Sequence, residues 1–133
     1  MPVLDASACV ALFKSDEQGH KASREWLAQA GQGDEPIVAP AILLAEVAAA
    51  LGRGLGDLML TDEALRMIRF GFVEIFPVTE TLAAKAATIA SRQRLRGCDS
   101  IYVALAEELK MELVTFDQEQ LQRGAAVIQV RTP

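Results

Sequence analysis

Residues that commonly act as catalytic bases and nucleophiles are scarce in this sequence. Among its 133 residues there is one histidine, His20, and there are two cysteines, Cys9 and Cys98. A mechanism with two histidines is excluded, and a Ser-His-Asp triad would need His20, which lies among polar residues and is expected on the surface. The cysteines lie in apolar neighbourhoods at no metal-ligand spacing, so we expect two reduced, buried thiols. Neither a GxxxxGKS/T nor a GxGxxG motif is present, so a nucleotide-binding loop has no support.

The sequence also lacks long hydrophobic runs and an excess of positive charge. No apolar stretch approaches the length of a membrane span, and no basic region precedes the apolar N-terminal stretch, so we expect a cytoplasmic protein without a membrane segment. The net charge of −5 by itself argues against nucleic-acid binding. Acids gathered at one metal site would weaken that argument. Length and composition predict a single domain over residues 1–133.

Short apolar runs alternate with helical patterns along the chain. The predicted strands cover 2–4, 37–39, 72–76, 112–116 and 125–130. The predicted helices cover 6–14, 15–30 from a capping box at SDEQ, 41–52 with Pro40 in the first turn, 61–70 and 79–94 from threonine caps, 97–110 and 117–122. This alternation predicts an α/β fold with three layers, α/β/α, around a central, mostly parallel sheet.

Acidic residues fall where such a sheet binds ligands, beyond the carboxyl ends of its strands. Asp5 ends the first strand and Asp117 directly follows ELVTF, while Asp99 opens a helix after LRGC. Glu46 is the only ionisable residue from 39 to 52, so it stands in an otherwise apolar helix. These positions predict that the four carboxylates share one edge of the sheet.

Each acid also has a purely structural interpretation. Asp5 and Asp99 could cap the helices that follow them, Asp117 could be a turn or cap residue, and Glu46 could be buried in a pair with an arginine. Four converging carboxylates, however, would repel one another and raise one another's pKa unless cations neutralised them. Ligands that offer only oxygen suit Mg²⁺ or Mn²⁺ rather than zinc, so together the acids favour a site for one of these ions.

The segments that contain the acids resemble a known family. VLDASACVALF, LLAEVAAAL, GCDSIYVALA and LVTFDQEQL, in this order and spacing, resemble the PIN-domain nucleases, and the size and motifs are similar to the VapC-type toxins of bacterial toxin–antitoxin pairs. The resemblance covers nearly the whole chain and implies an acidic, metal-dependent site that cleaves RNA. Carried over by position, the catalytic and metal-binding residues would be Asp5, Glu46, Asp99 and Asp117.

The resemblance also implies supporting residues and partners. Thr115 matches the small hydroxyl residue that the family has two places before the last acid. Ser7 matches the polar residue that the family often has near the first acid, and Ala6 stands where a threonine is common. The implied cofactor is Mg²⁺ or Mn²⁺, and the implied partners are an RNA substrate, a small antitoxin that covers the site, and a second copy in a homodimer. The helices around Trp26 and over 61–70 are the expected contact surfaces.

Three arginines precede the third acid and are candidates for binding RNA. Arg92, Arg94 and Arg96 could contact phosphates at the rim of the site, or they could form a solvated helix end. Two other functions stay open. One is a phosphoryl-accepting domain with Asp5 as nucleophile, although the extra acid that such sites place beside the strand-end aspartate is missing. The other is a non-catalytic PIN-fold binding module.

Overall fold

Five short strands form one parallel sheet in the computed structural model, which describes the backbone of residues 1–133 and every side chain except those of residues 54 and 55. Their order across the sheet is β3-β2-β1-β4-β5, and each neighbouring pair is parallel. The predicted parallel sheet is therefore confirmed. The strands are β1 (Pro2–Leu4), β2 (Ile37–Pro40), β3 (Val73–Phe76), β4 (Glu112–Val114) and β5 (Val130–Arg131).

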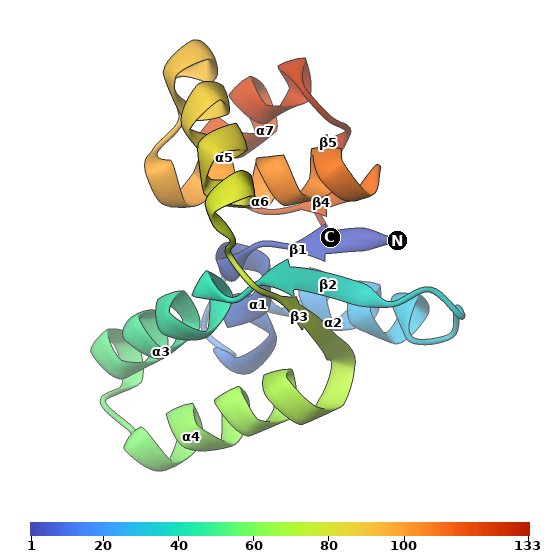
Figure 1. Cartoon of the computed structure of the whole chain (residues 1–133). Coiled ribbons are helices and arrows are strands. Elements are labelled where there is room, and N and C mark those ends of the chain that lie inside the picture. The colour runs from blue at the N-terminus through green and yellow to red at the C-terminus, as the bar shows by residue number, and fades with distance from the viewer.

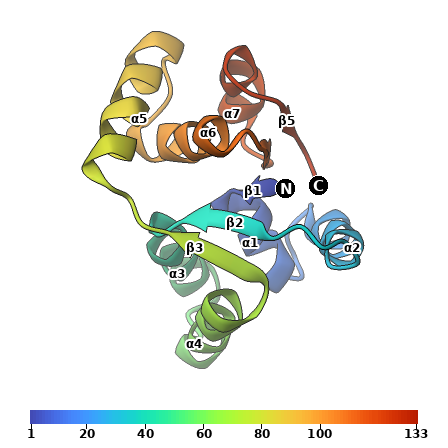
Figure 2. The same ribbon diagram turned by 45° about the vertical axis from the view of Figure 1, so that its right-hand side comes forward.

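Helices cover both faces of this sheet. They are α1 (Ala6–Phe13), α2 (His20–Ala30), α3 (Ile42–Leu55), α4 (Leu58–Met67), the π-helical turn η1 (Ile68–Phe72), α5 (Glu80–Gln93), α6 (Gly97–Leu109), α7 (Gln118–Arg123) and the 3₁₀ turn η2 (Gly124–Ala126). Figures 1 and 2 show α1 to α4 on one side of the strands and α5, α6 and α7 on the other. This is the three-layer α/β/α architecture that the alternation of elements predicts.

The central strands are apolar because helices bury them from both sides. Val3 and Leu4 of β1 and Leu113 and Val114 of β4 are fully buried. From α6 the whole run Tyr102–Ala106 is buried as well, which explains why this helix has almost no polar face. The residues that directly follow β1 and β4 therefore start from the most rigid part of the molecule.

The second helix begins later than predicted. The SDEQ residues form turns, in which the Glu17 N–H donates to the Lys14 carbonyl oxygen at 3.1 Å, and α2 begins only after Gly19. A Cβ at Gly19 would clash with the ring of Phe116, which follows β4. A contact with a distant part of the chain thus fixes this turn, and the local capping pattern carries no information about it.

Pro40 also lies in a different element from the predicted one. It is the last residue of β2, opposite Phe76 of β3, rather than part of the first turn of α3. The next residue, Ala41, donates its N–H to the Phe76 carbonyl oxygen at 2.8 Å, so sheet pairing continues to this point. Because proline has no N–H to lose, it is tolerated where the strand ends.

The break between α3 and α4 is shorter than predicted, because α3 ends later and α4 begins earlier than the sequence patterns indicate. α3 continues past Gly52 and ends at Gly56, which adopts φ of 61°, a left-handed conformation that favours glycine. Asp57 rather than Thr61 caps α4, since its carboxylate accepts the Leu60 N–H at 3.1 Å. The buried Thr61 hydroxyl donates instead to the Asp57 carbonyl oxygen at 2.9 Å, inside the helix.

The C-terminal strand is shorter than predicted. Most of 125–130 is turn, and β5 pairs with β4 only through Val130 and Arg131. A Cβ atom added at Gly124 would lie 3.4 Å from a side-chain carbon of Val103 and from one of Val130, so the chain turns tightly against α6 at this glycine. The cap at Thr79 is confirmed, because its hydroxyl accepts the Leu82 N–H at 3.1 Å.

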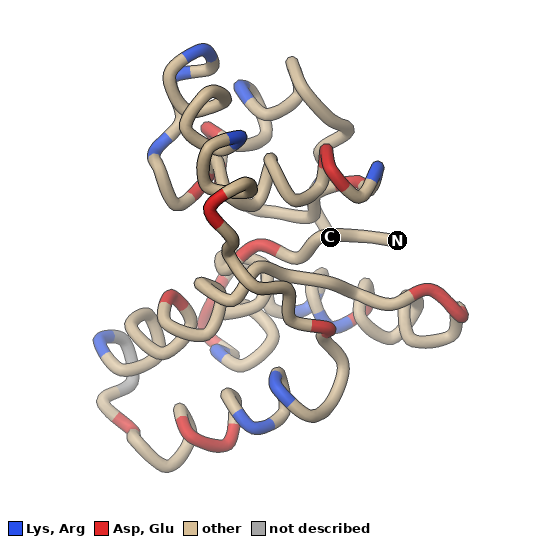
Figure 3. The backbone as a smooth tube through the Cα atoms, viewed as in Figure 1, with Lys and Arg blue, Asp and Glu red and all other residues tan. Residues whose placement is uncertain are grey.

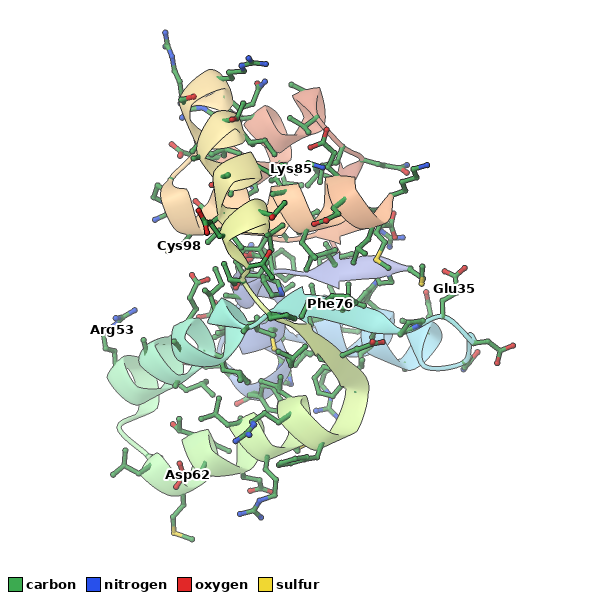
Figure 4. All side chains as sticks on the ribbon, viewed as in Figure 1. Glu35, Arg53, Asp62, Phe76, Lys85 and Cys98 are labelled. Carbon is green, nitrogen blue, oxygen red and sulfur yellow. The ribbon has the colours of Figure 1, made fainter. Side chains whose placement is uncertain are left out.

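Two expectations drawn from the composition can be compared with the structure. Cys9 is buried as expected, but Cys98 is exposed, because Asp99 and Ser100 take the inward positions of the same helical turn. Figure 4 labels Cys98 at the start of α6. Among the described residues, no helix is both long and apolar enough to cross a membrane.

Candidate active site

The four predicted acids lie on elements that meet at the carboxyl edge of the sheet. Asp5 directly follows β1, and its N–H donates to the carbonyl oxygen of Val114 in β4 at 3.0 Å. Asp117 follows β4, Asp99 lies in the first turn of α6, and Glu46 lies on α3. Figure 3 shows acidic positions on both helix layers where these layers approach each other beside the strands. Segments more than a hundred residues apart thus contribute to one region.

Asp5 is held by three hydrogen bonds to a single oxygen. Its Oδ2 accepts the Ser7 N–H at 3.1 Å, the Ser7 hydroxyl at 2.5 Å and the Thr115 hydroxyl at 2.7 Å. The first of these makes Asp5 the N-cap of α1. None of the hydrogen bonds found among the described residues uses Oδ1. Asp5 is only 4% exposed. The Ser7 N–H and the two hydroxyls fix its Oδ2, whereas its Oδ1 is left for a further partner.

Thr115 connects Asp5 to the rest of the site. Its fully buried hydroxyl also lies 2.7 Å from Oε1 of Gln120 and accepts the Asp117 N–H at 2.9 Å. Gln120 is fully buried too, and its Nε2 donates to the Asp99 carbonyl oxygen at 3.3 Å. Sequence reasoning missed Gln120, because one glutamine in the polar segment DQEQLQ has no distinguishing feature. This network joins the ends of β1 and β4 to the start of α6.

Glu46 has a tyrosine as its partner. The hydroxyl of Tyr102, which is fully buried in α6, donates to Glu46 Oε1 at 2.7 Å. Partial burial raises the pKa of Glu46, and the negative charges of Asp5 and Asp99 raise it further, while the Tyr102 hydrogen bond lowers it. Tyr102 was also missed, although a phenol three residues after Asp99 in an otherwise apolar run is a recognisable feature.

Asp99 and Asp117 share one arginine. Arg96 Nε donates to Asp99 Oδ2 at 2.8 Å, and Arg96 Nη2 donates to Asp117 Oδ2 at 3.3 Å. Burial is the main cause that raises the pKa of Asp99, Arg96 lowers it, and the charges of Asp117 and Asp5 raise it. The acids are therefore close enough to act on one another's protonation.

The structural interpretations of the acids hold for some of them. Asp117 caps α7, since its Oδ1 accepts the Gln120 N–H at 2.9 Å, as Asp5 caps α1. Asp99 is not a cap, because it lies inside the first turn of α6 and its carboxylate bonds Arg96. Glu46 bonds a tyrosine rather than an arginine. Capping thus accounts for two of the acids and leaves the burial of Asp99 and Glu46 unexplained.

The type of donor in this region fits a hard divalent cation. The four side chains offer carboxylate oxygens only, which Mg²⁺ and Mn²⁺ prefer. Glu46 and Asp99 have raised pKa values to which neighbouring carboxylates contribute, so a cation would relieve a repulsion that exists in the fold. Within the described part of the chain, no three His, Cys, Asp or Glu side chains are already gathered as a metal-binding group. Binding would therefore require rotation of side chains toward a common point.

A cleft opens beside the acids. It has a volume of about 700 Å³, and its lining includes Ser7 and Glu46 from the site, Gln118 from α7 and Arg53 from α3. Figure 4 labels Arg53 on the outer part of α3. Because the cation Arg53 lines the cleft together with Glu46, the cleft could receive an anionic chain beside the acids.

Other residues considered in the sequence make no contact with the acids in the described part of the chain. Arg92 is in the last turn of α5 and Arg94 follows it in a left-handed conformation, both exposed. Figure 3 shows basic residues at this end of α5 and on the segment that leads to α6. His20 is not at the acids: its Nδ1 lies 2.7 Å from the Ala11 carbonyl oxygen, beside an apolar groove between α1, α2 and α4.

The comparisons with known proteins concern the family and the fold. The PIN domain model matches residues 3–126 of the sequence. The chain belongs to the PIN domain family. No curated protein matches the sequence. The PIN fold is also found in VapC20 of Mycobacterium tuberculosis, described as a sarcin-ricin loop cleaving toxin, with a TM-score of 0.83, 18% identity and complete coverage of both chains.

Two further solved structures contain similar chains. A toxin–antitoxin complex from Klebsiella pneumoniae gives a TM-score of 0.73 at 19% identity, and the match covers 100% of this chain and 98% of the other. DNA-bound VapBC from Salmonella typhimurium gives 0.67 at 15% identity, covering 98% and 96%. At these identities the likeness concerns the fold, which is that of VapC toxins. The PIN fold predicted from the four motifs is therefore confirmed.

Proposed function

We propose that this PIN-domain protein is a cytoplasmic, metal-dependent endoribonuclease, the toxin of a type II toxin–antitoxin pair. The observation that carries the proposal is that Asp5, Glu46 and Asp99 come from three distant segments to the carboxyl edge of the sheet, where the charges of Asp5 and Asp99 raise the pKa of Glu46 and the charge of Asp5 raises that of Asp99. A fold gains nothing in stability from such mutual repulsion, so the arrangement is explained best by a cation that the acids bind. Membership of the PIN family gives the reaction class.

The roles proposed for the residues follow from their contacts. Asp5, Glu46 and Asp99 would be the principal ligands of Mg²⁺ or Mn²⁺, with Asp117 binding a second ion or orienting its water. A bound ion would supply water of lowered pKa and stabilise the charge that develops on the phosphodiester. The hydroxyls of Ser7 and Thr115 would orient Asp5 through hydrogen bonds, and the hydroxyl of Tyr102 would orient Glu46 in the same way.

Substrate binding is assigned to cationic groups around the site. Arg53 lines the cleft beside Glu46, and Arg92, Arg94 and Arg96 lie on the segment before Asp99. Each would contact phosphate groups, which predicts that binding of RNA weakens as salt concentration rises.

The test of activity uses Asp5→Asn, which keeps the shape of the side chain and removes its charge. We expect cleavage of total bacterial RNA in Mn²⁺, none in EDTA, and a loss of about 100-fold or more in the variant. Asp62→Asn is the matched control, because Asp62 is an exposed acid on α4 and forms no part of the site, and Figure 4 labels it on that helix. Cleavage by Asp5→Asn at the wild-type rate would refute the role of Asp5.

The proposed partners are an antitoxin and a second copy of the chain. An apolar groove of about 580 Å³ between α1, α2 and α4 is lined by residues such as Leu12, Leu27 and Met67, and Phe70 near its end is 76% exposed. Trp26, expected at a contact surface, is instead buried in the core. Expression alone should arrest growth, and co-expression of the adjacent short reading frame should relieve the arrest. Light scattering on the purified chain tests the homodimer.

A non-catalytic PIN-fold binding module is the competing function. The ion pairs of Arg96 favour it, because they already neutralise part of the acidic charge without a metal. Isothermal titration with Mn²⁺ separates the two functions, since a nuclease must bind the ion and a binding module need not.

A further inference from the structure

Arg96 has an unusual position for a residue at the start of a helix. It is the N-cap residue of α6, yet its side chain makes no capping bond and reaches two carboxylates that belong to different elements. Nε donates to Asp99 of α6 and Nη2 to Asp117 at the start of α7. The guanidinium therefore links the two acids.

The bond to Asp99 occupies one of the two carboxylate oxygens that could bind a metal ion. Asp99 is almost fully buried, and its Oδ2 is the acceptor of Arg96 Nε. At Asp117, Oδ1 accepts the Gln120 N–H and Oδ2 accepts Arg96, so both oxygens already have a donor. A divalent ion at these carboxylates would be repelled by the guanidinium and would compete with it for the same oxygens.

The arginine is also free to leave. Its side chain is 71% exposed, and its polar contacts among the described residues are those with the two acids. Moving it into solvent therefore disturbs no core packing, in contrast to Tyr102 or Gln120, which are fully buried. Because the guanidinium itself lies in solvent while Asp99 is buried, another cation that reached the carboxylate could take its place without leaving a buried charge unpaired.

We propose that Arg96 is a positioning residue that acts as the resident counter-cation of the site: it holds Asp99 and Asp117 together without metal and is displaced when Mg²⁺ or Mn²⁺ binds. This inference rests on the proposed function, because it requires the acids to be metal ligands. Arg96 thus sets the affinity for the ion.

The test measures metal affinity and stability in Arg96→Gln and in the matched control Arg66→Gln, which removes the same charge from the exposed face of α4. By isothermal titration, Arg96→Gln should bind Mn²⁺ at least about fivefold more tightly than the wild type, and Arg66→Gln should bind like the wild type. In EDTA, Arg96→Gln should have a lower Tm than the wild type, and Mn²⁺ should raise its Tm by more. Arg96→Lys, which keeps the charge but offers one donor nitrogen instead of the two that reach Asp99 and Asp117, should bind with intermediate affinity.

The outcomes separate this role from the proposed function. If the wild type binds Mn²⁺ and Arg96→Gln binds it equally or more weakly, the counter-cation role is overturned and the nuclease proposal stands. If Arg96→Gln changes Tm equally in EDTA and in Mn²⁺, the arginine is only a structural ion pair. If the wild type binds no Mn²⁺, both proposals fail.

Discussion

The hydroxyl of Thr115 provides the sharpest test of how the site is held together. Thr115→Val replaces that hydroxyl with a methyl group, and the shape and β-branching of the side chain stay the same. The residue is fully buried and lies directly after β4, so water cannot replace the lost partner. Any change in stability therefore reports the hydrogen bonds rather than packing or strand propensity.

The expected magnitude follows from the contacts. The hydroxyl has one proton, which can go to Asp5 Oδ2 or to Gln120 Oε1, both at 2.7 Å. A bond to a charged carboxylate contributes about 1.5–3 kcal/mol, and the bond accepted from the Asp117 N–H about 1 kcal/mol. We expect the free energy of unfolding to fall by about 3 kcal/mol, which a domain with a stability of about 5–15 kcal/mol survives.

Urea unfolding of the metal-free protein, followed by circular dichroism, measures this loss. Thr88→Val is the matched control, because the hydroxyl of the exposed Thr88 makes only a long bond of 3.4 Å within α5. The control should change stability by no more than about 0.5 kcal/mol. If Thr115→Val lost less than about 1 kcal/mol, Thr115 would not be the connection between Asp5 and the other elements.

Two further predictions concern the acids and the turn before α2. In the folded protein, the pKa values of Glu46 and Asp99 lie above their ordinary values of 4.5 and 3.8. The stability that proton binding to these two groups contributes is therefore complete below the ordinary values, and it is lost as the pH rises through the folded-state values. Glu46→Gln should therefore flatten the fall in stability above about pH 4 in EDTA, measured by urea unfolding; identical pH profiles would contradict this. Gly19→Ala places a Cβ against the Phe116 ring and should cost about 1–3 kcal/mol in the same assay. Gly71→Ala, with open space around the position, should cost much less, and equal costs would argue against the contact.

The sheet and most helices could be predicted because local patterns determine them. Apolar runs such as 2–4 and 112–114 become strands buried on both sides, and Thr79 caps α5 as its sequence context indicates. Two of the errors occur where a distant contact overrides a local pattern. Phe116 fixes the turn at Gly19, and sheet pairing keeps Pro40 in β2.

The predicted site differs from the observed one in the residues that connect the acids. The positions of Asp5 and Asp117 after strands, and of Asp99 at a helix start, follow from the order of elements. Gln120 and Tyr102 could not be assigned in this way, because their contacts with Thr115 and Glu46 join residues that are 5 and 56 positions apart. A side chain becomes part of such a network through packing, which a motif does not encode.

The acids are held in two different ways, and this difference indicates where a cation acts. Asp5 and Asp117 are helix caps, so backbone N–H groups already stabilise their negative charge. Glu46 and Asp99 cap no helix, and burial raises the pKa of both. A cation near these two carboxylates would supply the stabilising charge that burial otherwise leaves unmet. Arg96 supplies it to Asp99 at 2.8 Å, but Glu46 has only the Tyr102 hydroxyl as a direct partner among the described residues. A divalent ion that reached both carboxylates would therefore gain most at Glu46, which is the acid that the fold itself leaves without a positive neighbour in contact.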